Sequence, residues 1–511
     1  MANRSAQSLR NILVGLIVQF IEVFLKFFSR SIFIRSLPIV YLGVNGLFGE
    51  ILTMLSLAEL GLGGAIGYAL YKPLASSDKE KIASLMAFYK RAYALIGSIV
   101  LVLGLSLVPF LGRLVRHPDG VKENITFIYL LYLFNVVFSY FFSYRFTLLS
   151  ADQKTHVIQS VKAGISISRT LIQSFILLVY HNFYAYLIAE TAMIFLNNLF
   201  LYVYVGRHYP FLNRKVPPLE KSERWKIFKN IRALSIYKIS TLVVNSTENT
   251  IIGLFVGLKE VGYYSNYVIF IYLGTSLLAS IFSNISASVG NLNAETSPEH
   301  SHRIFKAIHL MNFWLYSLFS IGFLVCIEDV LRLWLGEEFL LGTPLAIVLS
   351  VNFYIKGMQN AVWVFKDSFG LFRYGQYLAP VQAGLHLGLA CLLGWRFGIC
   401  GILGAASIAR LLTTVWYDAW ALFKHGFHIP VRGYYRSYLC SAILFSGTAV
   451  LVWWLSTLLH NDSFAALLGK MLLSITIPNL LYMLLFARNA SFLLLSRRFR
   501  ELLIEKWYSV V

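Results

Sequence analysis

Long apolar runs recur along the whole chain, and each is long enough to cross a lipid bilayer as a helix. About 20 consecutive apolar residues span the hydrocarbon core, and the sequence predicts about fourteen such spans. The predicted spans are 11–35, 42–71, 88–112, 123–149, 156–179, 183–205, 233–257, 262–290, 305–327, 343–364, 378–395, 398–423, 435–458 and 464–487. These runs are continuous and do not alternate with a period of two, which argues against a strand barrel. We therefore expect an all-α polytopic membrane protein.

Composition supports this class and argues against an enzyme. Of the 511 residues, 58% are hydrophobic and 13% are charged, and the mean hydropathy is +0.67, beyond what a soluble core requires. Neither a zinc-protease, nucleophile-elbow nor phosphate-loop motif is present. The four cysteines lack metal-ligand spacing, and no segment between spans is large enough to form a catalytic domain. We expect a transporter with no cofactor and no metal.

The distribution of basic residues predicts the orientation. With the amino terminus inside, roughly thirty Lys and Arg residues fall on the inner side and about seven on the outer side. They are densest between Arg207 and Arg232. We therefore expect both termini to be cytoplasmic and the first span to be a retained anchor. Most of the formal charge of +20 then faces anionic membrane lipid, and no nucleic acid partner is expected.

A polar segment divides the predicted spans into two sets. His208–Lys229 carries the Pro217-Pro218 pair and resembles an interlobe linker. Leu42–Phe48 resembles Leu258–Tyr264, and both segments lie at the entry to the second span of a half, which is typical of a repeated lobe. The predicted division is an N-lobe at 1–207, a cytoplasmic linker at 208–230, a C-lobe at 231–430, and two extra spans with a basic amphipathic tail at 431–511.

Charged residues inside the spans are the strongest functional signal. Each would cost roughly 2.5 to 3.5 kcal/mol at the centre of a lipid-facing helix, so we expect them to face protein or water. The set comprises Glu22, Lys26, Arg30, Arg169, Lys238, Glu248, Lys356 and Arg410. They form polar stripes on several helices. Because cations predominate, the stripes predict one cavity between two lobes for an anionic substrate.

The cations have a substrate-binding interpretation and a structural one. Arg30 and Arg169 have no partner within their own helices, and guanidinium offers bidentate geometry for phosphate. Lys356 and Arg410 have two equally good interpretations. They line the cavity, or they sit at cytoplasmic span ends, from which their long side chains extend to the membrane interface.

The acids also allow two interpretations. Glu22 and Lys26 are spaced to form an i,i+4 pair that neutralises both charges, or Glu22 serves ion coupling. Glu248 is the best candidate for coupling to a proton or sodium ion. The alternative is a plain ion pair with Lys238.

Several segments resemble bacterial polysaccharide biosynthesis proteins. These are the Wzx-type oligosaccharide repeat-unit flippases of the multidrug/oligosaccharidyl-lipid/polysaccharide (MOP) exporter superfamily. The resemblance rests on Tyr41–Phe48, Leu55–Gly61, Tyr68–Leu74, Asn245–Asn249, Val256–Asn266 and Leu333–Gly336. It extends over nearly the whole chain and is densest at 30–93 and 238–338.

The resemblance implies a two-lobed bundle of six plus six helices with two extra helices, working by alternating access. The implied substrate is an undecaprenyl-pyrophosphate-linked oligosaccharide, moved across the bacterial inner membrane for O-antigen, capsule or other polysaccharide. Lys26, Arg30, Arg169, Lys238, Lys356 and Arg410 are then the candidate pyrophosphate ligands. Glu22 and Glu248 are the candidates for H⁺ or Na⁺ coupling. Other glycan-assembly membrane proteins are implied as partners.

Three alternatives stand beside this interpretation. A multidrug antiporter of the same superfamily would export organic cations, which favour acidic and aromatic linings, whereas cations predominate here. A lipid II flippase would move a chemically similar lipid. Membrane glycan polymerases and ligases resemble one another in carrying a large periplasmic loop. The longest loop here is predicted to be cytoplasmic, which argues against that class.

Overall fold

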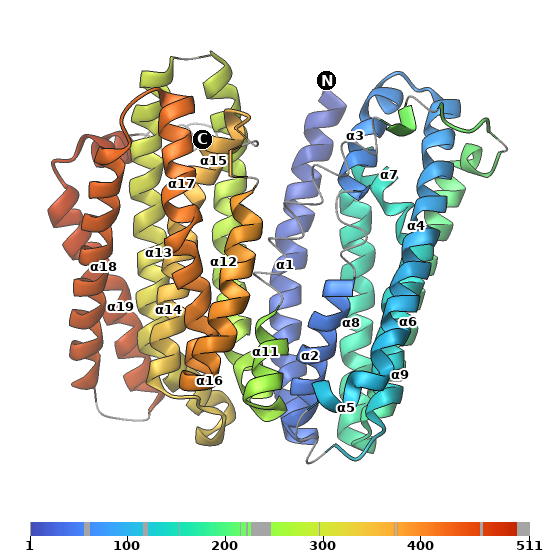
Figure 1. The fold of residues 1–511 in the computed structure, drawn as a ribbon, viewed down its shortest axis with the longest axis horizontal. Helices are drawn as coiled ribbons and strands as arrows, with labels where there is room; N and C mark the ends of the chain where they lie inside the picture. The colour runs from blue at the N-terminus through green and yellow to red at the C-terminus, as the bar shows by residue number, and fades with distance from the viewer. Residues whose placement is uncertain are drawn as a thin grey trace, which may run out of the picture. The chain divides into compact units, whose positions relative to one another are not determined.

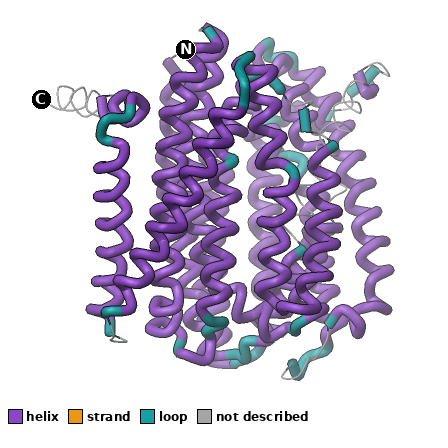
Figure 2. Tube along the Cα trace, turned by 60° about the vertical axis from the view of Figure 1, so that its left-hand side comes forward, coloured by secondary structure: helices purple, strands orange, loops and turns teal. Residues whose placement is uncertain are grey.

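The computed structural model describes residues 2–497 except for 56–61, 116–120, 153, 215, 221–222, 226–246, 296, 372–373, 376 and 460–462. All regular structure in this part of the chain is helical, and it contains no strand (Figures 1 and 2). Contacts divide the chain into two compact units, residues 1–265 and 266–511. This division differs from the predicted linker at 208–230. The lobes inferred from the repeat stay a prediction.

The first unit contains the helices that correspond to the predicted spans one to six and the end of span seven. Its helices are α1 (Ala2–Ser36), α2 (Val40–Leu55), α3 (Leu62–Ala75), α4 (Lys79–Leu107), α5 (Leu111–Leu114), α6 (Ile125–Ser143), α7 (Phe146–Ala151), α8 (Thr155–Tyr180), α9 (Phe183–His208) and α11 (Glu248–Phe255), with short 3-10 turns at Val108–Phe110 and Pro210–Asn213. Predicted span two corresponds to α2 and α3, and span four to α6 and α7.

The second unit contains the helices of the remaining spans. It begins within α12 (Leu258–Glu295) and continues with α13 (Pro298–Leu335), α14 (Thr343–Met358), α15 (Asn360–Ser368), α16 (Leu378–Leu412), α17 (Thr414–Leu422), α18 (Arg432–Thr457) and α19 (Phe464–Phe486), with a 3-10 turn at Glu337–Phe339 and a π-turn at Phe423–Phe427. Predicted span ten corresponds to α14 and α15.

A sharp bend at Gly398 divides α16 into the two halves predicted as spans eleven and twelve. Gly398 has φ +57°, a left-handed conformation that costs glycine little. The two halves come so close that a Cβ on Gly401 would lie 2.1 Å from the carbonyl oxygen of Leu393. One bent helix therefore supplies two of the predicted spans.

Eight helical segments among the described residues are long and apolar enough to cross a membrane: α4 with its following turn, α6, α8, α9, α13, the segment Leu378–Phe427 that joins α16 to α17 and the π-helix after it, α18 and α19. The predicted all-α, multi-pass membrane architecture is confirmed. For span seven the described residues include only its end, in α11. Lys238 and the tail beyond residue 497 lie outside the described residues.

Polar side chains precede many of these helices and cap their first turns. Asp78, Asn124, Asn182, Ser297 and Ser463 precede α4, α6, α9, α13 and α19. Each side-chain oxygen accepts a hydrogen bond from the backbone N–H three residues later, at 2.9–3.4 Å. These caps satisfy backbone donors that the helix leaves without a partner.

The two self-similar segments of the sequence pack directly on each other. A Cβ on Gly43 of α2 would lie 1.9 Å from the carbonyl oxygen of Leu258, and a Cβ on Gly262 would lie 2.5 Å from the carbonyl oxygen of Ile39. Only glycine allows this backbone approach. Both segments, including the start of α12 up to Ser265, belong to the first unit.

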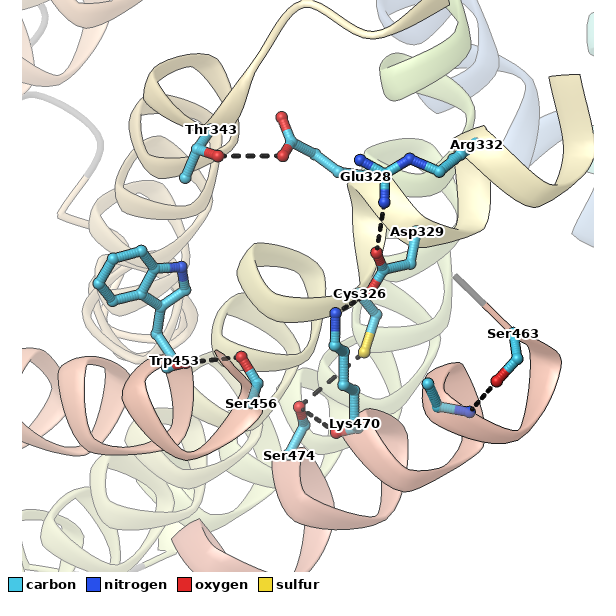
Figure 3. A network of polar contacts seen from close by, with 11 residues as sticks. Cys326, Glu328, Asp329, Arg332, Thr343, Trp453, Ser456, Ser463, Lys470 and Ser474 are labelled. Atoms are coloured by element: carbon cyan, nitrogen blue, oxygen red, sulfur yellow. Dashed lines mark hydrogen bonds and ion pairs between the residues drawn. The ribbon is translucent and has the colours of Figure 1, made fainter. Parts of the chain in front are cut away.

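A network of polar contacts ties α19 to α13 (Figure 3). Lys470 of α19 lies 2.6 Å from Asp329 of α13, which also pairs with Arg332 at 3.3 Å. Glu328 accepts a hydrogen bond at 3.0 Å from the hydroxyl of Thr343, at the start of α14. Asp329 therefore connects α13 to α19, and Glu328 connects α13 to the start of α14, within the second unit.

Candidate functional site

Charged residues on α1 and α8 face each other where the two helices pack. These helices pack side by side, and Glu22 of α1 forms a 2.9 Å ion pair with Lys162 of α8. The sequence suggested Lys26 as the partner of Glu22, one helical turn away. The structure shows an interhelical pair with Lys162, because α8 brings its own polar stripe against that of α1, and the neutralising role of Lys26 stays a prediction.

Arg169 of α8 has a counter-ion on the next helix. Its Nη1 lies 3.6 Å from Oε1 of Glu190 on α9. Glu190 is not among the predicted site residues, although a carboxylate inside the apolar span 183–205 is the same signal that identified the other charges. Arg169 is therefore partly neutralised, and it is a weaker pyrophosphate candidate than its isolation in α8 suggested.

Arg30 has a neutral partner. Its Nη1 donates to Oγ of Ser265 on α12 at 2.8 Å. Among the described residues no carboxylate lies within ion-pair distance of this guanidinium. Nearby, the ring of Phe33 meets that of Tyr186 edge to face at 5.3 Å. Arg30 thus keeps its positive charge beside an aromatic, low-dielectric wall, where attraction to an anion is strong.

Lys26 lies between these residues on α1. It is exposed in the first unit and within electrostatic reach of Glu22, Lys162 and Arg169. Together α1, α8 and α9 bring four cations and two carboxylates into one polar cluster: Lys26, Arg30, Lys162, Arg169, Glu22 and Glu190. Such a cluster can replace part of the hydration shell of a di-anion. Its role in binding pyrophosphate stays a prediction.

The carboxylates of Glu248 and Glu50 form a second feature of the first unit. Glu248, at the start of α11, accepts a hydrogen bond from the hydroxyl of Tyr264 at 2.6 Å. Glu50 of α2 accepts from the backbone N–H of Thr250 at 3.0 Å and from its hydroxyl at 3.4 Å. The sequence analysis did not single out Glu50. The alternative ion pair between Glu248 and Lys238 stays a prediction, since Lys238 lies outside the described residues.

Two predicted cations belong to the second unit. Lys356, in the last turn of α14, lines a cavity of about 310 Å³. Arg410 is buried near the end of α16, and His386 in the first half of the same helix is also buried. The structure thus assigns Lys26, Arg30 and Arg169 to one unit and Lys356 and Arg410 to the other.

The described part of the chain holds no group of three or more His, Cys, Asp or Glu side chains that could bind a metal ion. Cys326 is buried and Cys391 and Cys440 are exposed, and each is a free thiol. The charged clusters described above are therefore the features on which a function can be built.

Known proteins resemble this chain in structure, but no family is identified from its sequence. No protein-family model and no curated protein matches the sequence. Among solved structures, the lipid II flippase MurJ in an inward closed conformation superposes with a TM-score of 0.69 at 13% identity, covering 93% of this chain and 99% of that chain. An inward-facing multidrug resistance MATE family transporter of the MOP superfamily superposes with a TM-score of 0.60 at 14% identity, covering 79% of this chain and 94% of that chain.

A third solved structure agrees with these two. The Vibrio cholerae MATE transporter VcmN gives a TM-score of 0.54 at 12% identity, covering 83% of this chain and 98% of that chain. The chain therefore has the fold of the MOP exporter superfamily, as the resemblance predicted. At these identities the likeness concerns the fold, and the substrate has to be argued from the residues of this chain.

Proposed function

On the premise of a MOP exporter fold, we propose that this protein is a flippase for an undecaprenyl-pyrophosphate-linked oligosaccharide. It moves this lipid from the cytoplasmic to the periplasmic leaflet of a bacterial inner membrane, by ion-coupled alternating access, for O-antigen, capsule or a related polysaccharide. Both termini are cytoplasmic in this proposal, and H⁺ or Na⁺ is the coupling ion.

The observation that carries the proposal is the environment of Arg30. Its guanidinium is held by the Ser265 hydroxyl at 2.8 Å, in a cluster where cations outnumber carboxylates. A hydroxyl fixes the direction of the guanidinium without neutralising it. Arginine so placed can donate to two phosphate oxygens at once, which matches the group that a lipid-linked oligosaccharide must carry through a membrane.

The sign of this cluster disfavours the multidrug antiporter. An organic cation would be repelled by Lys26, Arg30, Lys162 and Arg169, which outnumber the two carboxylates of the cluster, Glu22 and Glu190. A lipid II flippase is chemically closer, because its substrate also carries a pyrophosphate. Competition between the two lipids distinguishes that alternative from the proposed one.

Transbilayer movement in proteoliposomes tests the proposal. The substrate is a fluorescent undecaprenyl-pyrophosphate oligosaccharide, and the fluorescence of the outer leaflet is measured with and without a proton or sodium gradient. We expect movement by the wild type, a loss of at least about tenfold in Arg30→Ala, and partial recovery in Arg30→Lys. The gradient that accelerates movement identifies the coupling ion.

Arg35→Ala is the matched control, since Arg35 is exposed at the end of the same helix and its removal lowers the net charge equally. It should leave movement unchanged. No movement by the wild type, with efflux of an organic cation by the same preparation, would replace the flippase with a multidrug antiporter. Stronger competition by lipid II than by the oligosaccharide lipid would favour the lipid II flippase.

A further inference from the structure

The cavity beside Lys356 is built within the second unit from α12, α13, α14 and α15. Its volume is about 310 Å³, at the lower end of the range for small-molecule sites. Six of its lining residues carry the argument: Phe282, Tyr316, Phe353, Lys356, Asn360 and Trp363. They come from all four helices, so packing of the helices fixes their positions.

One side of this cavity is an aromatic wall. The ring of Tyr316 stacks on Phe282 at 6.1 Å and lies 5.3 Å from the ring of Phe353. Phe282, Tyr316 and Phe353 are buried. Gly357 makes room for this wall, because a Cβ there would lie 1.9 Å from Cδ1 of Tyr316. The wall therefore offers flat apolar faces in fixed positions.

The rim of the cavity is polar. Asn360 donates to the hydroxyl of Tyr316 at 3.5 Å, and Lys356 is exposed. The indole of Trp363 is fixed by a 3.1 Å hydrogen bond to Asp418, which Lys366 holds by an ion pair at 2.5 Å. Amide, phenol and ammonium groups thus lie around an aromatic face.

We propose that this cavity is a subsite for one sugar ring of the transported oligosaccharide. A pyranose has an apolar face of C–H groups and a rim of hydroxyls, and the cavity has an aromatic wall and a polar rim. A polyprenyl chain would leave the rim groups unsatisfied, and a phosphate alone would leave the wall unused. The assignment rests on the proposed function and adds where its glycan is held.

Binding of two lipids by the full-length protein in nanodiscs tests this subsite. One probe is undecaprenyl-pyrophosphate oligosaccharide, and the other is undecaprenyl pyrophosphate without sugar. Ala279→Phe fills the cavity from its exposed rim. Asn360→Leu removes the amide at similar size. We expect each variant to lower the affinity for the sugar-bearing probe about tenfold and to leave the affinity for the sugar-free probe unchanged.

Ala465→Phe adds the same bulk at an exposed position of α19 and should change neither affinity. Equal weakening of both probes by Ala279→Phe would assign the cavity to the lipid part and overturn the subsite. Unchanged binding of both probes in Ala279→Phe and Asn360→Leu would overturn it as well. Failure of the wild type to bind either probe would instead overturn the proposed function, and with it the subsite.

Discussion

Arg30 and Ser265 lie 235 residues apart in the sequence, and a 2.8 Å hydrogen bond joins them. The bond connects α1 to the first turns of α12. The hydroxyl of Ser265 orients the guanidinium of Arg30 without neutralising its charge. The two residues should therefore contribute differently to transport.

Ser265→Ala should reduce transport less than Arg30→Ala. The alanine removes one hydrogen bond, typically worth about 1 kcal/mol, and leaves the charge in place. We expect a loss of about three- to tenfold in the initial rate of lipid movement. Ser265→Thr keeps the hydroxyl and should retain most of the rate. Equal losses for Ser265→Ala and Arg30→Ala would mean that the bond, and not the charge, is what transport requires.

Glu190→Gln should destabilise the protein through Arg169. The pair is partly exposed, with side-chain exposures of 35% and 24%, so the cost should lie between that of a surface pair and a buried one, at about 2 kcal/mol. The thermal unfolding midpoint of the purified protein measures it. The double variant Arg169→Met with Glu190→Met should recover most of the loss. A double variant as unstable as the sum of two single variants would contradict an ion pair.

Gly43→Ala should separate α2 from the start of α12. The added Cβ would lie 1.9 Å from a backbone oxygen of Leu258, which no side-chain rotation can relieve, and overpacking of this kind costs about 1–3 kcal/mol. Gly49→Ala on the same helix is the control, because its Cβ would have no neighbour within 4 Å. We expect a lower unfolding midpoint for Gly43→Ala and an unchanged or higher one for Gly49→Ala. Equal midpoints would contradict the close approach.

Lys470→Met should loosen α19 from α13. Both partners of the Lys470–Asp329 pair are largely buried, with side-chain exposures of 17% and 16%. Without Lys470 the Asp329 carboxylate keeps only Arg332 as a partner, which should lower the free energy of unfolding by about 2–3 kcal/mol. Protection of α19 against hydrogen exchange measures the effect. Lys90→Met, at an exposed position of α4, should leave that protection unchanged. Unaltered exchange in Lys470→Met would show that apolar packing alone holds the helix.

The contacts of Tyr209 with the loop between α7 and α8 should make the free energy of unfolding fall at alkaline pH. Tyr209 donates to Asp152 at 2.5 Å, and Lys154 donates to Tyr209 at 3.0 Å. Burial, and then the hydrogen bond to Asp152, raises the pKa of Tyr209 to about 12. Burial lowers the pKa of Lys154, but the hydrogen bonds to Asp152 and Tyr209 outweigh it, so that the pKa of Lys154 is raised.

The sign of the pH effect follows from these two raised pKa values. Both groups hold their protons more tightly in the folded state, so their contribution is complete below about pH 10, and that of Tyr209 is lost as the pH approaches about 12. Tyr209→Phe should be less stable than wild type by about 1–2 kcal/mol at pH 8, and the difference should shrink above about pH 10. Tyr180→Phe, at an exposed position, should follow the wild type throughout. A difference that stays constant to about pH 11.5 would contradict this assignment.

The sequence by itself determined the class of this protein and most of its spans. Apolar runs of spanning length can satisfy their backbone groups in lipid only as helices. The same rule identified Glu22, Arg30 and Arg169 as residues that need a polar environment, because a charge in hydrocarbon is costly wherever the helix is placed.

Only the tertiary structure decided which residues these charges meet. Helical phase places Lys26 one turn from Glu22, but it does not indicate that Glu22 also pairs with Lys162 or that Arg169 pairs with Glu190. Partners on different helices depend on which faces pack together, and periodicity within one helix carries no information about that. The same reason explains why the glycines at 43 and 262, the cavity beside Lys356 and the link from Lys470 to Asp329 emerged only from the fold.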